Sequence, residues 1–290
     1  MNILQAILLG LVEGITEYLP VSSTGHLSLT AWLLGLGQTP ESKQSIDAFI
    51  IIIQGGAILA VLGLYRARVQ SMLRGVGGTD AAGRRLLMLL VVAFLPAAVF
   101  GLLLDDLIDA YLLRPIPVIV MLFAGGVLLI AIKPWQDGLR RRQESGEGRP
   151  FRNIEDLTVK DALIIGLMQC VAMIPGTSRS MMTILGGLTA GLPPAKAAEF
   201  SFLLGLPTLS AACAYKLMKQ IKDHGLDFVV PLGGWLPVVV GIAVAALSAA
   251  LAVKWLVRYL ETHSFVIFGV WRIAVALVLA VAIFQGALTL

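Results

Sequence analysis

The sequence predicts an all-α polytopic membrane protein. We expect an inverted-topology repeat, each half of which holds one re-entrant helical hairpin and three transmembrane helices. Composition is the first reason: 58% of the 290 residues are hydrophobic and 14% are charged, whereas soluble domains carry about 25% charged residues. The second reason is that several apolar runs are continuous and reach the ~20 residues that cross a bilayer as a helix, unlike the alternating pattern of a barrel. The third is that the two halves of the chain repeat.

Full spans are expected where long apolar runs lie between polar loops, at 47–65, 86–104, 116–133, 197–218, 235–255 and 265–284. Two further pairs of apolar segments are shorter: 3–18 with 26–36, and 159–174 with 181–192. Each pair surrounds a polar turn that begins at a proline, which predicts a re-entrant hairpin. Such a turn is tolerated at membrane depth only where protein or a watery cavity surrounds it.

The repeat is visible as sequence similarity between the two hairpins. Residues 6–11, Ala-Ile-Leu-Leu-Gly-Leu, match residues 162–167, Ala-Leu-Ile-Ile-Gly-Leu, and residues 20–23 match residues 175–178 with one residue of slippage. Because each half has an odd number of spans, the second half must enter the membrane from the opposite side. The predicted organisation is one membrane domain, 1–290, composed of repeat one (1–133), a linker (134–158) and repeat two (159–290).

The charges of the loops predict an orientation in the membrane. One face receives most of the basic residues, namely Arg66, Arg68, Arg74, Arg84, Arg85, those between 140 and 152, Lys196, Lys254 and Arg258. The other face receives an acidic loop at 105–109 and few basic residues, chiefly Lys216, Lys219 and Lys222, which run against the overall charge pattern. The positive-inside rule places the first face in the cytoplasm and both termini outside, so the first hairpin opens toward the outer side. Since the basic residues lie in these loops, the net charge of +4 indicates orientation among membrane lipids and no nucleic-acid partner.

Glu13 and Glu17 lie one helical turn apart in the first hairpin and therefore share a face. Two neighbouring carboxylates in a low-dielectric site cannot both stay charged cheaply, so either one takes a proton or a cation lies between them. Their hard oxygens suit Mg²⁺ or Ca²⁺ bound jointly with a phosphate. We expect Glu13 and Glu17 to be metal ligands. The structural alternative is a buried polar pair bonded to the other hairpin.

Ser22, Ser23 and Thr24 stand at the start of the second short helix, where backbone N–H groups and the helix dipole favour an anion. Alone, these hydroxyls would indicate an ordinary N-cap. With His26 one turn on, they resemble a nucleophile with an acid/base partner, because an imidazole can exchange protons near neutral pH. The alternative for His26 is a structural bond to a backbone carbonyl.

Arg179 lies in the matching turn of the second hairpin, between Ser178 and Ser180. A guanidinium at membrane depth needs an anionic partner, and its planar fork suits phosphate oxygens. The alternative is an ion pair with Glu13 or Glu17 alone. Gln169 and Met173 stand where the first hairpin has its glutamates, so the two hairpins are specialised.

Two polar residues outside the hairpins complete the candidate set. Gln54 in the first long span and Glu199 near the start of the fourth occupy similar places after the two hairpins. Gln54 is expected to bond a hairpin turn. Glu199 is expected either as a helix-terminus charge or as a support for the second hairpin.

The hairpin motifs resemble those of the undecaprenyl-pyrophosphate phosphatase family of the bacitracin-resistance type. Residues 13–26 are Glu-Gly-Ile-Thr-Glu-Tyr-Leu-Pro-Val-Ser-Ser-Thr-Gly-His, and residues 175–180 are Pro-Gly-Thr-Ser-Arg-Ser. The flanking motifs Ile53-Gln54 and Glu-Phe-Ser-Phe-Leu-Leu at 199–204 also look like those of the family. The resemblance implies an enzyme of the bacterial inner membrane that removes one phosphate from a C55 lipid pyrophosphate with a divalent cation. The monophosphate carrier is thereby recycled for cell-wall synthesis, which implies bacitracin resistance.

Carried over to matching positions, the resemblance makes Ser23 the nucleophile, His26 its acid/base partner, Glu17 part of the acidic pair and Arg179 the phosphate clamp. The residues expected to bind substrate are Glu13, Ser22, Thr24, Gly25, Thr177, Ser178, Ser180 and Gln54. This sequence departs from the family at Met181-Met182, where Gly-Ala is usual, and these bulky side chains could narrow the cleft or tilt the clamp.

Two alternatives to this mechanism stay open at the level of sequence. Within the same class, His26 or Glu17 could activate water directly, with no covalent intermediate. In a different class, inverted repeats with broken helices are a transporter architecture, so the protein could flip the lipid monophosphate, alone or in addition to hydrolysis. A homodimer is a further expectation about partners.

Overall fold

A computed structural model describes residues 1–37, 39–112, 114–145, 150–225, 230 and 232–285. Within this part of the chain the structure is helical and six helices are long and apolar enough to cross a membrane, so the predicted all-α fold with six spans is confirmed. The spanning helices are α3 (Pro40–Leu64), α5 (Ala81–Leu107), α6 (Pro115–Ala131), α10 (Pro194–His224), α11 (Trp235–Thr262) and α12 (Val266–Phe284).

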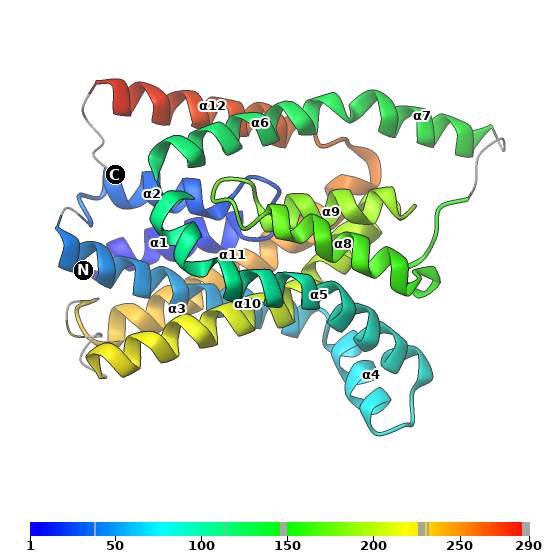
Figure 1. Cartoon of the computed structure of the whole chain (residues 1–290), viewed down its shortest axis with the longest axis horizontal. Coiled ribbons are helices and arrows are strands. Elements are labelled where there is room, and N and C mark those ends of the chain that lie inside the picture. Colours follow the sequence, from blue (N-terminus) through cyan, green and yellow to red (C-terminus); the bar gives the residue numbers. More distant parts are fainter. Residues whose placement is uncertain (38, 113, 146–149, 226–229, 231, 286–290) are drawn as a thin grey trace.

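The two predicted hairpins are pairs of short helices. The first consists of α1 (Ile3–Thr16) and α2 (Ser23–Leu33), and the second of α8 (Val159–Val171) and α9 (Arg179–Thr189). Figure 1 shows α1–α2 entering the helix bundle from the left and α8–α9 from the right, so that their turns approach each other in the interior. This arrangement is consistent with an inverted repeat.

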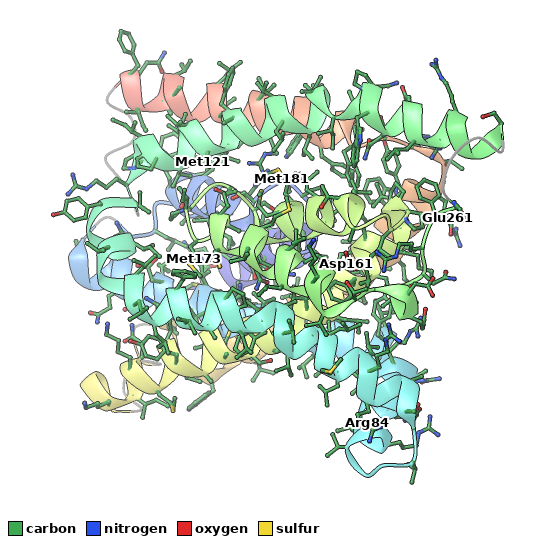
Figure 2. All side chains as sticks on the ribbon, turned by 45° about the vertical axis from the view of Figure 1, so that its right-hand side comes forward. Arg84, Met121, Asp161, Met173, Met181 and Glu261 are labelled. Atoms are coloured by element: carbon green, nitrogen blue, oxygen red, sulfur yellow. The ribbon has the colours of Figure 1, made fainter. Side chains whose placement is uncertain are left out.

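Two helices were not expected from the sequence. The first, α4 (Arg66–Val76), projects from the body beside α5, and Arg84 marks this corner in Figure 2. The second, α7 (Lys133–Glu144), prolongs the line of α6 into the segment predicted to be only a linker. Pro134 does not break this helix because it stands in its first turn, where a missing N–H is tolerated. A short 3₁₀ turn, Ile154–Asp156, precedes α8.

Close backbone contacts fix the first hairpin against α11. A Cβ added to Gly10 would lie 2.6 Å from the carbonyl oxygen of Gly241, and one added to Gly14 would lie 2.3 Å from that of Ala245. Only glycine allows backbones to approach so closely. Because Gly14 directly follows Glu13, this contact holds the acidic face of α1 at a fixed distance from α11.

The basic loops meet at one end of the molecule, on the right of Figure 1. Arg68 of α4 pairs with Glu155 before α8 (2.6 Å) and with Glu199 of α10 (3.2 Å). Arg140 of α7 donates to the carbonyl of Thr262 at the end of α11 (3.4 Å). Loops that the charge pattern assigned to one face therefore do lie together, and Glu199 serves as a charge near the start of its helix.

We predict that two adjacent glycines of α3 differ in their tolerance of a methyl group. A Cβ at Gly56 would lie 2.3 Å from the carbonyl oxygen of Ile242 in α11, whereas one at Gly55 would meet no atom of the described residues within 4 Å. Gly56→Ala should therefore lower the free energy of unfolding by about 1–3 kcal/mol through overpacking. Gly55→Ala should leave it unchanged or raise it by up to ~1 kcal/mol. Denaturant titration in mixed micelles measures both, and equal effects would contradict the packing described.

Candidate functional site

Both hairpin turns contain one residue in the same strained backbone conformation. Ser22 has φ 73° and caps α2, and Ser178 has φ 80° and caps α9. These two are the non-glycine residues with positive φ in the described chain, and such strain persists only where surrounding structure enforces it, often at functional sites. The paired caps correct the expected slippage: Ser22 is equivalent to Ser178, so Ser23 is equivalent to Arg179.

A continuous polar network joins the two turns. The hydroxyl of Ser23 donates to Glu17 Oε2 at 2.8 Å, and Arg179 Nη2 donates to Glu17 Oε1 at 2.9 Å. One carboxylate thus bonds the expected nucleophile from its own hairpin and the expected clamp from the other. The ion pair that was the structural alternative for Arg179 exists, and the hydroxyl of Ser23 belongs to the same network.

The guanidinium of Arg179 is held by α10 and by an aromatic ring. Its Nη1 donates to the carbonyl of Ser201 at 3.1 Å, and a Cβ at Gly205 would lie only 2.8 Å from the same nitrogen. The ring of Tyr18 lies with its centroid 5.3 Å from the guanidinium carbon, a cation–π distance. Arg179 Nε is buried and has no hydrogen-bond partner among the described residues.

Most buried side-chain atoms that lack a hydrogen bond in the described chain gather in the two hairpins. They are both carboxylate oxygens of Glu13, the hydroxyls of Tyr18 and Thr177, the amide nitrogen of Gln169 and Nε of Arg179; Gln136 supplies one more elsewhere. Folded proteins keep such atoms few because each costs about 1–3 kcal/mol. Their concentration at one place indicates a site built to receive a polar group.

The carboxylate pair fits a divalent cation in part. Glu13 is 1% exposed, and a cation would satisfy its unbonded oxygens, while Glu17 one turn on supplies a second carboxylate. No cluster of three or more metal-binding side chains occurs in the described residues. The two glutamates could therefore hold Mg²⁺ or Ca²⁺ only if phosphate oxygens and water completed the coordination.

His26 is bonded on both ring nitrogens. Trp271 Nε1 of α12 donates to its Nε2 at 2.7 Å, and its Nδ1 lies 2.7 Å from the carbonyl oxygen of Ser22. An indole N–H can only donate, so Nε2 of His26 accepts. Its Nδ1 is therefore protonated and donates a hydrogen bond to the carbonyl oxygen of Ser22. His26 therefore contacts the strained cap. The structural alternative expected from the sequence, a hydrogen bond from His26 to a backbone carbonyl, is present in the structure.

The remaining predicted residues of the first turn divide by exposure. Ser22 is buried with its backbone strained, Thr24 is exposed, and Ser23 between them is partly buried. Gly25 is buried and packs closely against α6, since a Cβ at this position would lie 2.7 Å from the side chain of Leu122. Ser23 and Thr24 are thus the hydroxyls of this turn that solvent or substrate can reach.

In the second turn, the predicted residues mainly join the hairpins. Ser180 is fully buried and its hydroxyl donates to the carbonyl of Leu19 at 2.8 Å, while the hydroxyl of Ser178 lies 3.0 Å from that of Ser180. Thr177 is also buried. The expectation that Gln54 bonds a hairpin turn is wrong for the described residues: its Oε1 accepts a bond from Cys213 of α10 at 3.1 Å.

Met181 and Met182 do not displace the clamp. Both side chains are buried in the main hydrophobic core, and Met181 lies in the middle of the packed helices in Figure 2. Arg179 still reaches Glu17. The effect expected from these two residues, a narrowed cleft or a tilted clamp, is thus not evident at the guanidinium.

A largely apolar cavity of about 360 Å³ between α5, α8 and α10 leads to Arg179. Phe94 and Leu102 of α5 and Ala212 of α10 line its walls, and Gln169 lines it beside Arg179. Glu17 and Ser23 are not among its lining residues. Arg179 therefore belongs both to the wall of this cavity and to the network that contains Ser23.

Sequence reasoning missed Trp271 and Arg272, which stand side by side in α12 and contact the turns. Arg272 donates to the carbonyls of Pro20 (3.3 Å) and Gly176 (2.8 Å). A signal was present, because Arg272 is a lone charge inside an apolar span, and such charges mark functional sites by default. Gly205, which makes room for Arg179, carried no comparable signal.

Comparisons with known proteins agree on one family. Residues 6–278 match the family described as bacitracin resistance protein BacA. A protein named undecaprenyl-diphosphatase from Sorangium cellulosum is 46% identical over 277 residues, covering 95% of this chain and 85% of that protein. Proteins of the same name from Methylibium petroleiphilum and, numbered 2, Rhodospirillum rubrum are 41% and 42% identical, covering 94% and 98% of this chain and 92% and 96% of theirs.

The ion pair between the turns should be strongly coupled in a double-mutant cycle. The side chains of Arg179 and Glu17 are only 12% and 4% exposed, so removing one partner leaves a buried charge and should cost about 3–5 kcal/mol. We measure the free energy of unfolding of Arg179→Met, Glu17→Leu and the double variant in mixed micelles. The double variant should lose far less stability than the sum of the two single-variant losses. The exposed pair Lys133–Asp137 is the matched control, with a coupling below ~1 kcal/mol. Additive losses at Arg179 and Glu17 would contradict the contact.

Proposed function

This chain belongs to the bacitracin resistance protein BacA family, and from that membership we propose that it hydrolyses undecaprenyl diphosphate to undecaprenyl phosphate and inorganic phosphate. The observation that carries the proposal is the concentration of unbonded polar atoms around the Arg179–Glu17–Ser23 network. The two hairpins together supply a hydroxyl (Ser23), a carboxylate (Glu17) and a guanidinium (Arg179). Such groups suit phosphoryl transfer, since its catalysis is mainly positioning and charge stabilisation.

Arg179 binds the phosphate in this proposal. Its Nε has no partner in the described structure, and a guanidinium fork binds phosphate oxygens in two parallel bonds. The N-termini of α2 and α9 add backbone N–H groups and the positive ends of two helix dipoles. Together they neutralise the charge that develops on the terminal phosphate.

Ser23 attacks the terminal phosphorus through Oγ, and its proton passes to Glu17 Oε2, which lies 2.8 Å away. The bond from that phosphorus to the bridging oxygen breaks, and the lipid monophosphate leaves with the electron pair. Glu17 gives this proton to the departing lipid monophosphate. Water then attacks the phosphoserine, which releases inorganic phosphate and restores the Ser23 hydroxyl. We assign the proton transfer to Glu17, because both ring nitrogens of His26 are already bonded; His26 then fixes the cap beside the nucleophile.

Glu13 and Glu17 are the residues that would hold a divalent cation with the phosphate. When bound, such a cation would offset phosphate charge as a Lewis acid. Without it, both buried carboxylate oxygens of Glu13 have no hydrogen bond within the part of the chain that the structure describes, which is costly in an apolar site.

The apolar cavity that leads to Arg179 suits the isoprenoid end of the substrate. Its walls come from α5, α8 and α10, and predominantly apolar walls with a few polar groups are typical of ligand sites. We further propose that the enzyme lies in the bacterial inner membrane, opens toward the periplasm, recycles the carrier for cell-wall synthesis and confers bacitracin resistance. A homodimer also remains a proposal.

The hydroxyl of Ser23 should be essential, and that of Ser28 in the same helix should not. Phosphate release from undecaprenyl diphosphate is measured for purified protein in detergent, where no two membrane sides exist and a flippase alone would release nothing. Ser23→Ala should lower kcat at least about a thousandfold, while Ser28→Ala stays close to wild type. Labelled phosphate should be trapped on Ser23. A Ser23→Ala enzyme with near-full turnover would favour direct attack by water.

A chelator should abolish activity, and added Mg²⁺ or Ca²⁺ should restore it. Because a cation on phosphate oxygens is worth several kcal/mol, the loss should be about a hundredfold or more. Glu13→Gln should raise the cation concentration needed for half-maximal rate, while phosphate release at saturating cation recovers in part. Titration of rate against free cation measures this. Full activity of the chelated wild-type enzyme would remove the cation from the proposal.

A further inference from the structure

Arg272 is a fully buried cation whose hydrogen bonds all go to backbone carbonyls. It is 0% exposed. Besides Pro20 and Gly176, it donates from Nε to Leu122 at 3.2 Å and from Nη2 to Met121 at 2.9 Å, both in α6. Burying a charge is costly unless hydrogen bonds compensate it. Four carbonyl contacts on three segments indicate that this position is built for a guanidinium.

The two turn carbonyls that Arg272 binds are equivalent atoms of the two hairpins. Pro20 stands two residues before the strained cap Ser22, and Gly176 stands two residues before the strained cap Ser178. One planar group therefore contacts the same position of both tips and ties them to α6. Its neighbour Trp271 holds His26 from the same helix.

The fold clears space for this guanidinium with a glycine. A Cβ at Gly125 of α6 would lie 2.2 Å from Arg272 Nη2 and 2.8 Å from its central carbon. Any other residue at this position would force the guanidinium away from the turns. A lysine at 272 would also fail, because a single ammonium lacks the planar fork that reaches several carbonyls.

We propose that Arg272 is a positioning residue that sets the separation and orientation of the two hairpin tips. In the described chain it forms no hydrogen bond with Ser23 or Arg179; it acts by bracing the turns that carry them, so that both face one phosphate. The inference rests on the proposed phosphatase function for its kinetic consequence. Misplacing reacting groups by about 1 Å can cost on the order of a hundredfold in rate.

The test compares Arg272→Lys and Gly125→Ala with wild type. Gly63→Ala is the control, since a Cβ at Gly63 would meet no described atom within 4 Å. Rates are expressed per folded, monodisperse molecule. Both test variants should lower kcat by about ten- to a hundredfold with a smaller change in KM, and the double variant should be no slower than the slower single one. If Arg272→Lys does not fold, Gly125→Ala carries the test.

Hydrogen exchange of the tip amides, at 19, 21–23 and 176–179, gives a readout that does not depend on catalysis. Both tips should exchange faster in the two test variants and unchanged in Gly63→Ala. If the wild-type protein releases no phosphate but the tips of both test variants exchange faster, the proposed phosphatase function is wrong and the bracing role of Arg272 is supported. Unchanged kcat per folded molecule with unchanged tip exchange would overturn the inference.

Discussion

The carboxylate of Glu17 is the point on which the arrangement depends, because it bonds Ser23 of one hairpin and Arg179 of the other. In an apolar interior neither the carboxylate nor the guanidinium is stable alone, so the two tips must meet. Much of the surrounding structure serves that meeting. Gly10 and Gly14 seat the first hairpin on α11, and Gly205 leaves room for the guanidinium.

The two hairpins share a backbone and differ in chemistry. When the two hairpins are aligned on their strained caps, Ser23 is equivalent to Arg179 and Glu13 to Gln169, so equivalent positions carry the proposed nucleophile and a cation, or an acid and an amide. Two arginines facing each other at the tips would repel, and two serines would leave a phosphate without a counter-charge. The similar backbones of the two hairpins bring their tips together, and the different side chains at equivalent positions let one tip bond the other.

Hydropathy was sufficient to predict the six spans and the two hairpins, because twenty apolar residues or a polar turn at membrane depth each permit few structures. The tip residues were predictable for a related reason: burying the charged side chains of Glu17 and Arg179 in an apolar interior costs free energy, so such residues usually have a functional partner. Partners were not predictable. His26 bonds Trp271 and Arg272 bonds Gly176 across long stretches of sequence, and carbonyl partners leave no side-chain signal. Aligning the prolines instead of the caps caused the slippage of one residue.

The most direct measurement is a structure of the protein bound to a non-hydrolysable diphosphate analogue that carries an isoprenoid chain. One phosphate group should contact the Arg179 guanidinium on one hairpin and lie within reach of Ser23 Oγ on the other, with the chain in the cavity between α5, α8 and α10. A phosphate held by one hairpin alone, with Arg179 and Ser23 unable to reach it together, would contradict the proposed site.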